Sequence, residues 1–162
     1  MAPVMKIYFC GSIRSGRTDA AIYARIVEIL GKYGTVLTPD VGDTKITAMG
    51  LSEGEAETDK EIHDRDVKLL EECDVIVAEV TQPSLGVGYE IGRGVAMSKK
   101  ILCLYRPQPD RILSAMIRGA EMGEMFTTKD YKEEDLPVIL EEFFFKQRSR
   151  KDSLDWNTYE PM

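Results

Sequence analysis

The sequence has few of the residues that build metal sites and disulfides. It contains three cysteines and one histidine in 162 residues. Cys10, Cys73 and Cys103 are an odd number with wide spacing, and two of them lie in apolar, strand-like runs, so we interpret them as reduced core thiols. Because the sequence contains neither a CxxC motif nor a histidine cluster, we expect no metal site and no cofactor.

Long apolar runs and an excess of positive charge are also missing. No apolar stretch reaches membrane-spanning length, and residues 1–6 lack the apolar core of a signal peptide. We therefore expect an intracellular, cytoplasmic protein, with the nucleus as an alternative because of the basic run Lys146–Lys151. The net charge of -7 argues against a general nucleic-acid binder, whose affinity depends on neutralising phosphates. Neither a membrane nor a nucleic acid is an expected partner.

Strand-like and helical segments alternate along the chain. Apolar runs typical of strands lie at residues 6–10, 35–38, 74–80, 101–105 and 125–131, and helical periodicity covers residues 18–33, 58–73, 87–99, 110–119 and 133–146. Such alternation favours right-handed crossovers and a parallel sheet covered on both faces. We expect one α/β domain over residues 1–146, a flavodoxin-like (Rossmann-like) three-layer sandwich with a five-stranded parallel sheet of order 2-1-3-4-5. Residues 147–162 are expected to form a flexible tail.

Two glycine-rich loops follow the first and third strands. In the order 2-1-3-4-5 the winding reverses between these strands, and ligands bind there, outside the carboxyl ends. The first loop has hydroxyls, arginines and main-chain N–H groups that suit a phosphate monoester, but a solvated turn explains the same pattern. It matches neither the Walker A nor the G-x-G-x-x-G pattern. Its residues are Gly11, Ser12, Ile13, Arg14, Ser15, Gly16 and Arg17.

The second loop, Thr81–Glu90, leads into a segment with glycines at positions 86, 88, 92 and 94. Each glycine inside a helix costs about 1 kcal/mol relative to alanine. So much bare backbone suits close helix packing, or close approach of a ligand to main-chain N–H groups. Glu90 falls in the expected first turn of the helix, where the helix dipole favours an ionised carboxylate. A charge that only stabilises the helix is the alternative.

Asp66 is a carboxylate set in an apolar stripe of the helix over residues 58–73. An unpaired buried carboxylate is costly, so we expect a specific partner or a raised pKa, both of which are frequent at functional sites. An edge position that reaches water is the alternative. The residues that project at the same angle are Ile62, Leu69, Leu70 and Cys73.

Four other features have more than one interpretation. The phenol of Tyr8 either packs in the core or orients a carboxylate at the crevice. Glu79 is interpreted as a structural hydrogen-bonding carboxylate, with support of the site as the alternative, and His63 as a surface or packing residue. The polar side of the segment 110–119 faces either water or another subunit.

Three stretches, Tyr8–Arg14, Val80–Glu90 and Leu113–Gly119, closely resemble the 2'-deoxynucleoside 5'-phosphate N-hydrolases, which are relatives of the nucleoside 2-deoxyribosyltransferases. The similarity covers residues 6–145 in unbroken order. The resemblance implies a flavodoxin-like homodimer that cleaves the N-glycosidic bond of 2'-deoxynucleoside 5'-monophosphates. The products would be the free base and 2-deoxyribose 5-phosphate.

The resemblance also implies roles for single residues. Glu90 is similar to the nucleophile that attacks the anomeric carbon and forms a deoxyribosyl-enzyme intermediate. Asp66 resembles the acid that protonates the departing base and then activates water, and Tyr8 the residue that positions the nucleophile and disfavours ribose. The resemblance assigns the phosphate site to Gly11 through Arg17, Ser84 and Gly86, and a segment that enters the neighbouring subunit's site to Ser114, Ala115 and Met116.

Two positions bear on the substrate. Ser84 stands where the transferases place an acid, six residues before the nucleophile, and a serine can donate a hydrogen bond to a 5'-phosphate that an acid would repel. Relatives have Thr-Glu-His-Val after the second strand, where this chain has Thr38-Pro-Asp-Val41. Asp40 therefore leaves the base preference open, as the sequence does for the roles of the 39–57 loop and the tail. A deoxyribosyltransferase and a non-catalytic nucleotide-binding module remain as alternative functions.

Overall fold

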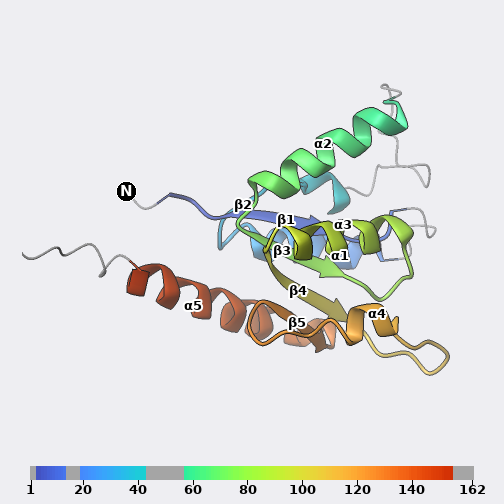
Figure 1. The fold of residues 1–162 in the computed structure, drawn as a ribbon. Coiled ribbons are helices and arrows are strands. Elements are labelled where there is room, and N and C mark those ends of the chain that lie inside the picture. Colours follow the sequence, from blue (N-terminus) through green and yellow to red (C-terminus); the bar gives the residue numbers. More distant parts are fainter. Residues whose placement is uncertain (1–2, 14–18, 43–56, 155–162) are drawn as a thin grey trace, which may run out of the picture.

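In the computed structural model, a five-stranded parallel sheet lies between two layers of helices (Figure 1). The structure describes residues 3–13, 19–42 and 57–154. The strand order β2-β1-β3-β4-β5 confirms the predicted flavodoxin-like architecture. The strands are β1 (Lys6–Cys10), β2 (Thr35–Val36), β3 (Val75–Glu79), β4 (Lys100–Tyr105) and β5 (Phe126–Asp130).

The helices cover both faces of the sheet. Side chains of α1 and α5 pack in one core cluster, and side chains of α2 and α3 pack in the other. Because successive strand residues point to opposite faces, Ile7 and Phe9 of β1 belong to the first cluster, and Tyr8 and Cys10 to the second. The helices are α1 (Ala20–Leu30), η1 (Pro39–Gly42), α2 (Asp59–Glu72), α3 (Leu85–Ala96), α4 (Ala115–Arg118), η2 (Glu133–Asp135) and α5 (Leu136–Leu154).

Hydrogen bonds from side chains decide where several elements begin and end. The capping box predicted for α2 is present, since the Glu61 N–H donates to Thr58 Oγ1 at 3.2 Å and the Thr58 N–H donates to Glu61 Oε2 at 2.8 Å. Strand β2 is shorter than predicted. The Phe9 N–H donates to Thr38 Oγ1 at 2.9 Å and the Thr38 hydroxyl donates to the Phe9 carbonyl at 2.6 Å, so a side chain replaces the main-chain hydrogen bonds that would extend the strand. Within the described part of the chain, no helix combines the length and apolar character needed to cross a membrane.

Two helix boundaries differ from the sequence prediction. The helix expected over residues 110–119 is reduced to Ala115–Arg118, because Ser114 accepts a hydrogen bond from the Met116 N–H and caps the helix there. Helix α5 continues to Leu154, so residues 147–154, predicted as part of a flexible tail, are helical. This segment contains neither glycine nor proline to end the helix. Residues 155–162 lie outside the described residues.

Helix α3 approaches the sheet closely at Gly94. A Cβ atom at this position would lie 2.3 Å from Ile76 Cδ1 and 3.2 Å from Ile101 Cδ1, and both isoleucines are fully buried. At Gly88 and Gly92 a Cβ atom would meet nothing within 4 Å. Any larger residue at position 94 therefore forces these buried side chains to shift, whereas positions 88 and 92 have room for a Cβ atom.

Replacement of Gly94 by alanine should destabilise the protein by about 1–3 kcal/mol, because the added methyl group overpacks a core that has no room for it. Urea denaturation of the wild type and the variant measures the difference. Gly92→Ala is the matched control in the same helix, and it should be neutral or stabilising by up to about 1 kcal/mol. Equal effects at both positions would contradict the packing argument.

Candidate active site

Glu90, the predicted nucleophile, contacts its predicted partner Tyr8 where α3 faces β1. Tyr8 lies within β1, and only 1% of it is exposed. Its phenol donates a hydrogen bond to Oε1 of Glu90 over 3.0 Å. The two residues are 82 positions apart in the sequence, and the alternation of side chains along β1 turns Tyr8 towards the helix that holds Glu90. The phenol of Tyr8 therefore orients a carboxylate as well as packing in the core.

The prediction that Glu90 lies in the first turn of its helix is wrong. The Ser84 side chain accepts a hydrogen bond from the Val87 N–H at 3.3 Å and is the N-cap, so α3 begins at Leu85. Counting from Leu85, Glu90 is the sixth residue of the helix and lies in the second turn, and the first turn contains no acidic residue. The helix dipole acts mainly within the first turn, so it does not explain the charge state of Glu90.

Burial raises the pKa of Glu90 to about 7. The hydrogen bond from Tyr8 opposes this shift, the negative charge of Asp66 adds to it, and a hydrogen bond from the Cys10 thiol opposes it. The carboxyl group is therefore half-ionised near neutral pH and is more basic than an exposed glutamate. All three cysteines are free and buried, which confirms their interpretation as core thiols. Cys10 also reaches Glu90, because it lies two residues after Tyr8 on the same face of β1.

Asp66 has both properties that its apolar position predicts. It lies on α2, and 27% of its side chain is exposed. Burial raises the pKa of Asp66, and the positive charge of Arg65 opposes the shift. The Arg65 Nε–H donates to Asp66 Oδ1 at 3.1 Å, and a second nitrogen of Arg65 pairs with Glu57 at 2.5 Å. The sequence did not indicate Arg65 as the partner, because adjacent residues point in different directions on an ideal helix.

The loop after β1 begins against Tyr23. The Ser12 N–H donates to the Tyr23 hydroxyl at 3.1 Å, and a Cβ atom at Gly11 would lie 2.9 Å from the Tyr23 ring. Gly11 is therefore required by the close approach of this ring. Ser12 is buried and Ile13 is half-buried. The remaining predicted phosphate-binding residues of this loop, Arg14, Ser15, Gly16 and Arg17, lie outside the described residues.

The other predicted substrate-binding residues lie on separate elements. Ser84 is half-buried at the start of α3, and a Cβ atom at Gly86 would have only Ser84 Oγ near it, at 3.8 Å. Asp40 is exposed on η1. Ser114 and the two residues after it, Ala115 and Met116, are exposed at the start of α4. This exposure is what a contribution to a neighbouring subunit requires, and that contribution stays a prediction.

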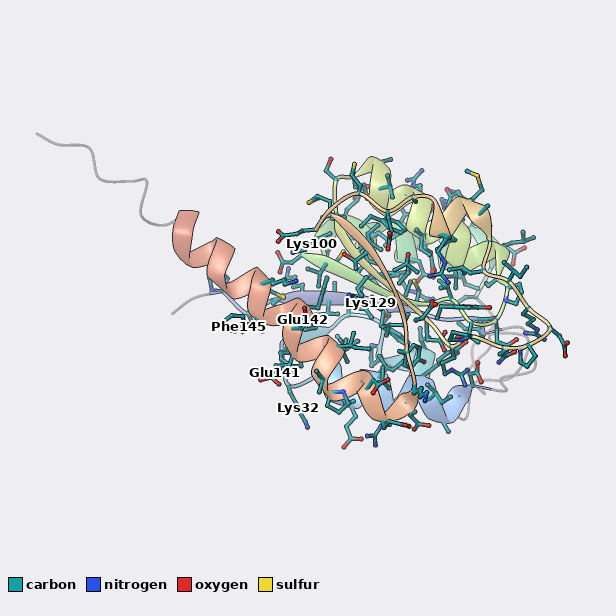
Figure 2. All side chains as sticks on the ribbon, turned by 90° about the horizontal axis from the view of Figure 1, so that it is seen from below. Lys32, Lys100, Lys129, Glu141, Glu142 and Phe145 are labelled. Carbon is teal, nitrogen blue, oxygen red and sulfur yellow. The ribbon has the colours of Figure 1, made fainter. Side chains whose placement is uncertain are left out.

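A separate cavity of about 220 Å³ lies between β4, β5 and α5. Figure 2 labels Lys100, Lys129 and Glu142, which line this cavity beside α5. It includes none of the predicted site residues, so it is distinct from the site that Tyr8 and Glu90 define. Among the described residues, no group of three or more His, Cys, Asp or Glu side chains is arranged to hold a metal ion.

The sequence is similar to a known protein family and to several named enzymes. The family model described as nucleoside 2-deoxyribosyltransferase matches residues 7–133. The 5-hydroxymethyl-dUMP N-hydrolase of Danio rerio is 57% identical over 140 residues, which cover 86% of this chain and 96% of the relative. The protein of the same name from Homo sapiens is 54% identical over 138 residues, or 85% of this chain and 78% of the relative.

Two solved structures are similar at lower sequence identity. The solution structure of BlsM has a TM-score of 0.62 and 19% identity, covering 99% of this chain and 100% of the other. The CMP N-glycosidase BcmB of Clostridium botulinum has a TM-score of 0.56 and 22% identity, covering 84% of this chain and 98% of the other. At these identities the two structures support the fold alone.

Replacement of Glu90 by glutamine should stabilise the protein above neutral pH. The native state holds the Glu90 proton up to a pKa of about 7, whereas the unfolded chain releases it near the ordinary value of 4.5. Wild-type stability therefore falls as pH rises through this window, and Glu90→Gln removes the loss. We expect a gain of roughly 1–3 kcal/mol over the wild type at about pH 8 and a smaller gain at about pH 5. Urea denaturation at both pH values measures it, and equal gains at both would contradict the shifted pKa.

Proposed function

The chain belongs to the nucleoside 2-deoxyribosyltransferase family, and from this membership we propose that it hydrolyses the N-glycosidic bond of 2'-deoxynucleoside 5'-monophosphates. The products are the free nucleobase and 2-deoxyribose 5-phosphate. The main supporting observation is the hydrogen bond from Tyr8 to Glu90, which orients a carboxyl group whose pKa is about 7. The relatives named 5-hydroxymethyl-dUMP N-hydrolase support a monophosphate substrate.

In the proposed reaction Glu90 is the nucleophile. Its ionised carboxylate attacks C1' of the sugar while the bond from C1' to the base nitrogen breaks, which forms a deoxyribosyl ester of Glu90. Asp66 gives its proton to the departing base. Water then attacks C1', Asp66 takes a proton from this water, and the ester bond breaks to return Glu90 as a carboxylate. The raised pKa of Asp66 supports its role as the proton donor.

Tyr8 and Ser84 account for the choice of a deoxynucleotide. The Tyr8 ring lies beside the reacting carboxylate, where its bulk would disfavour a ribose 2'-hydroxyl. Ser84 accepts a hydrogen bond from the Val87 N–H, and its own O–H remains a donor that suits a phosphate oxygen. Base transfer to a second nucleobase in place of water is the competing outcome, and the described geometry of Glu90 serves both reactions.

We also propose that the protein is a homodimer. Four of the exposed large apolar side chains lie on α3 and around α4, and a second copy that covers them would remove their apolar surface from water. Ser114 lies between two of them, so a second copy that covers this surface brings Ser114 towards the neighbouring site. The residues and their exposed fractions are Leu85 at 96%, Tyr89 at 49%, Ile112 at 98% and Met116 at 82%.

Incubation with a panel of deoxynucleoside monophosphates, including 5-hydroxymethyl-dUMP, should release free base, and the matching ribonucleotides should release much less. Product analysis by chromatography measures it, and the panel also shows the base preference that Asp40 leaves open. Glu90→Gln should lower kcat by at least about a thousandfold, because the amide is a poor nucleophile. Release of no base from any monophosphate contradicts the proposal, and base exchange that requires an added nucleobase favours a transferase.

The control for the phosphate is Ser84→Asp. Aspartate is as good an N-cap as serine, so α3 should keep its start, while its negative charge repels a 5'-phosphate. We expect activity on the monophosphate to fall at least about tenfold, with no comparable loss on the unphosphorylated deoxynucleoside. Equal losses on both substrates would show damage to the helix start instead.

A mixed dimer tests the shared site. Glu90→Gln and a bulky Ser114→Trp variant should each be nearly inactive alone, and mixing them should restore about a quarter to a half of the wild-type activity, because one of the two sites then has both intact residues. Ultracentrifugation measures the oligomeric state of each sample. A monomeric protein, or an absence of any recovery in a verified mixed dimer, contradicts the shared site.

A further inference from the structure

A buried ion pair lies beside the crevice, and the sequence did not indicate either of its members. Arg106 follows β4, and its Nη2 donates to Asp19 Oδ2 over 2.5 Å. Asp19, just before α1, has 7% of its side chain exposed, and Arg106 has 21%. A charged hydrogen bond so far withdrawn from water is stronger than a pair on the surface. It connects the end of the loop after β1 to the sheet.

The loop after β3 is bound by the same two residues. The main-chain N–H of Arg106 donates to Thr81 Oγ1 at 2.9 Å. The side-chain amide of Gln82 donates to Asp19 Oδ2 at 3.3 Å, and Arg111 donates in turn to the amide oxygen of Gln82. One carboxylate oxygen of Asp19 therefore accepts hydrogen bonds from both Arg106 and Gln82. The loops after β1 and β3 are connected at this atom.

Glu79, at the end of β3, anchors this network in the core. It is fully buried, and it accepts hydrogen bonds from the Thr81 N–H at 2.7 Å and from the Tyr131 hydroxyl at 3.2 Å. Arg106 Nε lies 3.7 Å from its second oxygen. Arg106 thus lies between two buried carboxyl groups, those of Asp19 and Glu79, and its removal would leave both without this cation.

We propose that Arg106 is a positioning residue for the 5'-phosphate. Through Asp19 and Thr81 it holds the residue before α1 beside the loop after β3, and this loop brings Ser84 to the phosphate. Arg106 does not itself touch the substrate in this arrangement. The inference rests on the proposed function, since it explains how the phosphate subsite of that same active site keeps its shape.

The test is a double variant, Asp19→Asn with Arg106→Gln, which removes both charges of the pair, while Glu79 loses Arg106 but keeps its hydrogen bonds from the Thr81 N–H and the Tyr131 hydroxyl. We expect its KM for 5-hydroxymethyl-dUMP to rise about tenfold, which corresponds to the loss of one hydrogen bond between the displaced loop and the phosphate, with kcat changed less than about twofold. Glu133→Gln is the control, because it breaks the exposed pair of Arg25 and Glu133, 3.8 Å apart, which also involves α1. This control should keep the wild-type KM.

A readout without turnover separates positioning from general damage. Calorimetric titration should show about tenfold weaker binding of 2-deoxyribose 5-phosphate to the double variant, and unchanged binding of the unphosphorylated deoxynucleoside. Unchanged binding of the sugar phosphate, equal losses for both ligands, or no binding of it by the wild type overturns the inference. If the double variant does not fold, Arg106→Lys, which keeps the charge but loses the planar fork, is compared in the same way. Wild-type protein that binds the sugar phosphate but releases no base contradicts the proposed function alone.

Discussion

The withdrawal of one carboxyl group from water is the constraint on which the rest of the site depends. Glu90 is half-buried where α3 faces β1, and burial of its carboxyl group raises its pKa to about 7. A carboxylate withdrawn from water needs hydrogen-bond donors. Tyr8 and Cys10, which lie on the same face of β1, donate to it. These two hydrogen bonds depend on the sheet, because the sheet fixes which β1 side chains point towards α3.

Much of the fold was predictable, because local sequence and packing agree there. The apolar runs predicted five strands, the order assumed from the flavodoxin-like fold is the observed one, and Thr58 with Glu61 marked the start of α2. The predicted start of α4 was wrong because the cap made by a single side chain, and not the apolar periodicity, decides where this helix begins. Ser114 caps the start of α4, close to the end of the segment 110–119 that was predicted as a helix. Residues 110–113 are therefore not helical, and Ile112 remains almost fully exposed.

The contact between Tyr8 and Glu90 was predictable from the sequence, but the electrostatics of the candidate site were not. Motif and periodicity selected Tyr8, Asp66 and Glu90, yet the expected effect of the helix dipole on Glu90 was wrong because desolvation is set by the neighbours in space. The same limit applies to Asp19 and Arg106, which lie 87 positions apart and meet only after the sheet has formed. Each of them alone resembles an ordinary surface charge in the sequence.

The close contact at Gly94 has a consequence for chemistry as well as for packing. Glu90 and Gly94 are four residues apart, on one face of α3, so the distance between helix and sheet at Gly94 determines how deeply the carboxyl group is inserted. A larger residue at position 94 would lift the helix and let water reach Glu90, which lowers its pKa. The pKa of Glu90 therefore depends on the volume of the side chain at position 94, one turn further along the same helix.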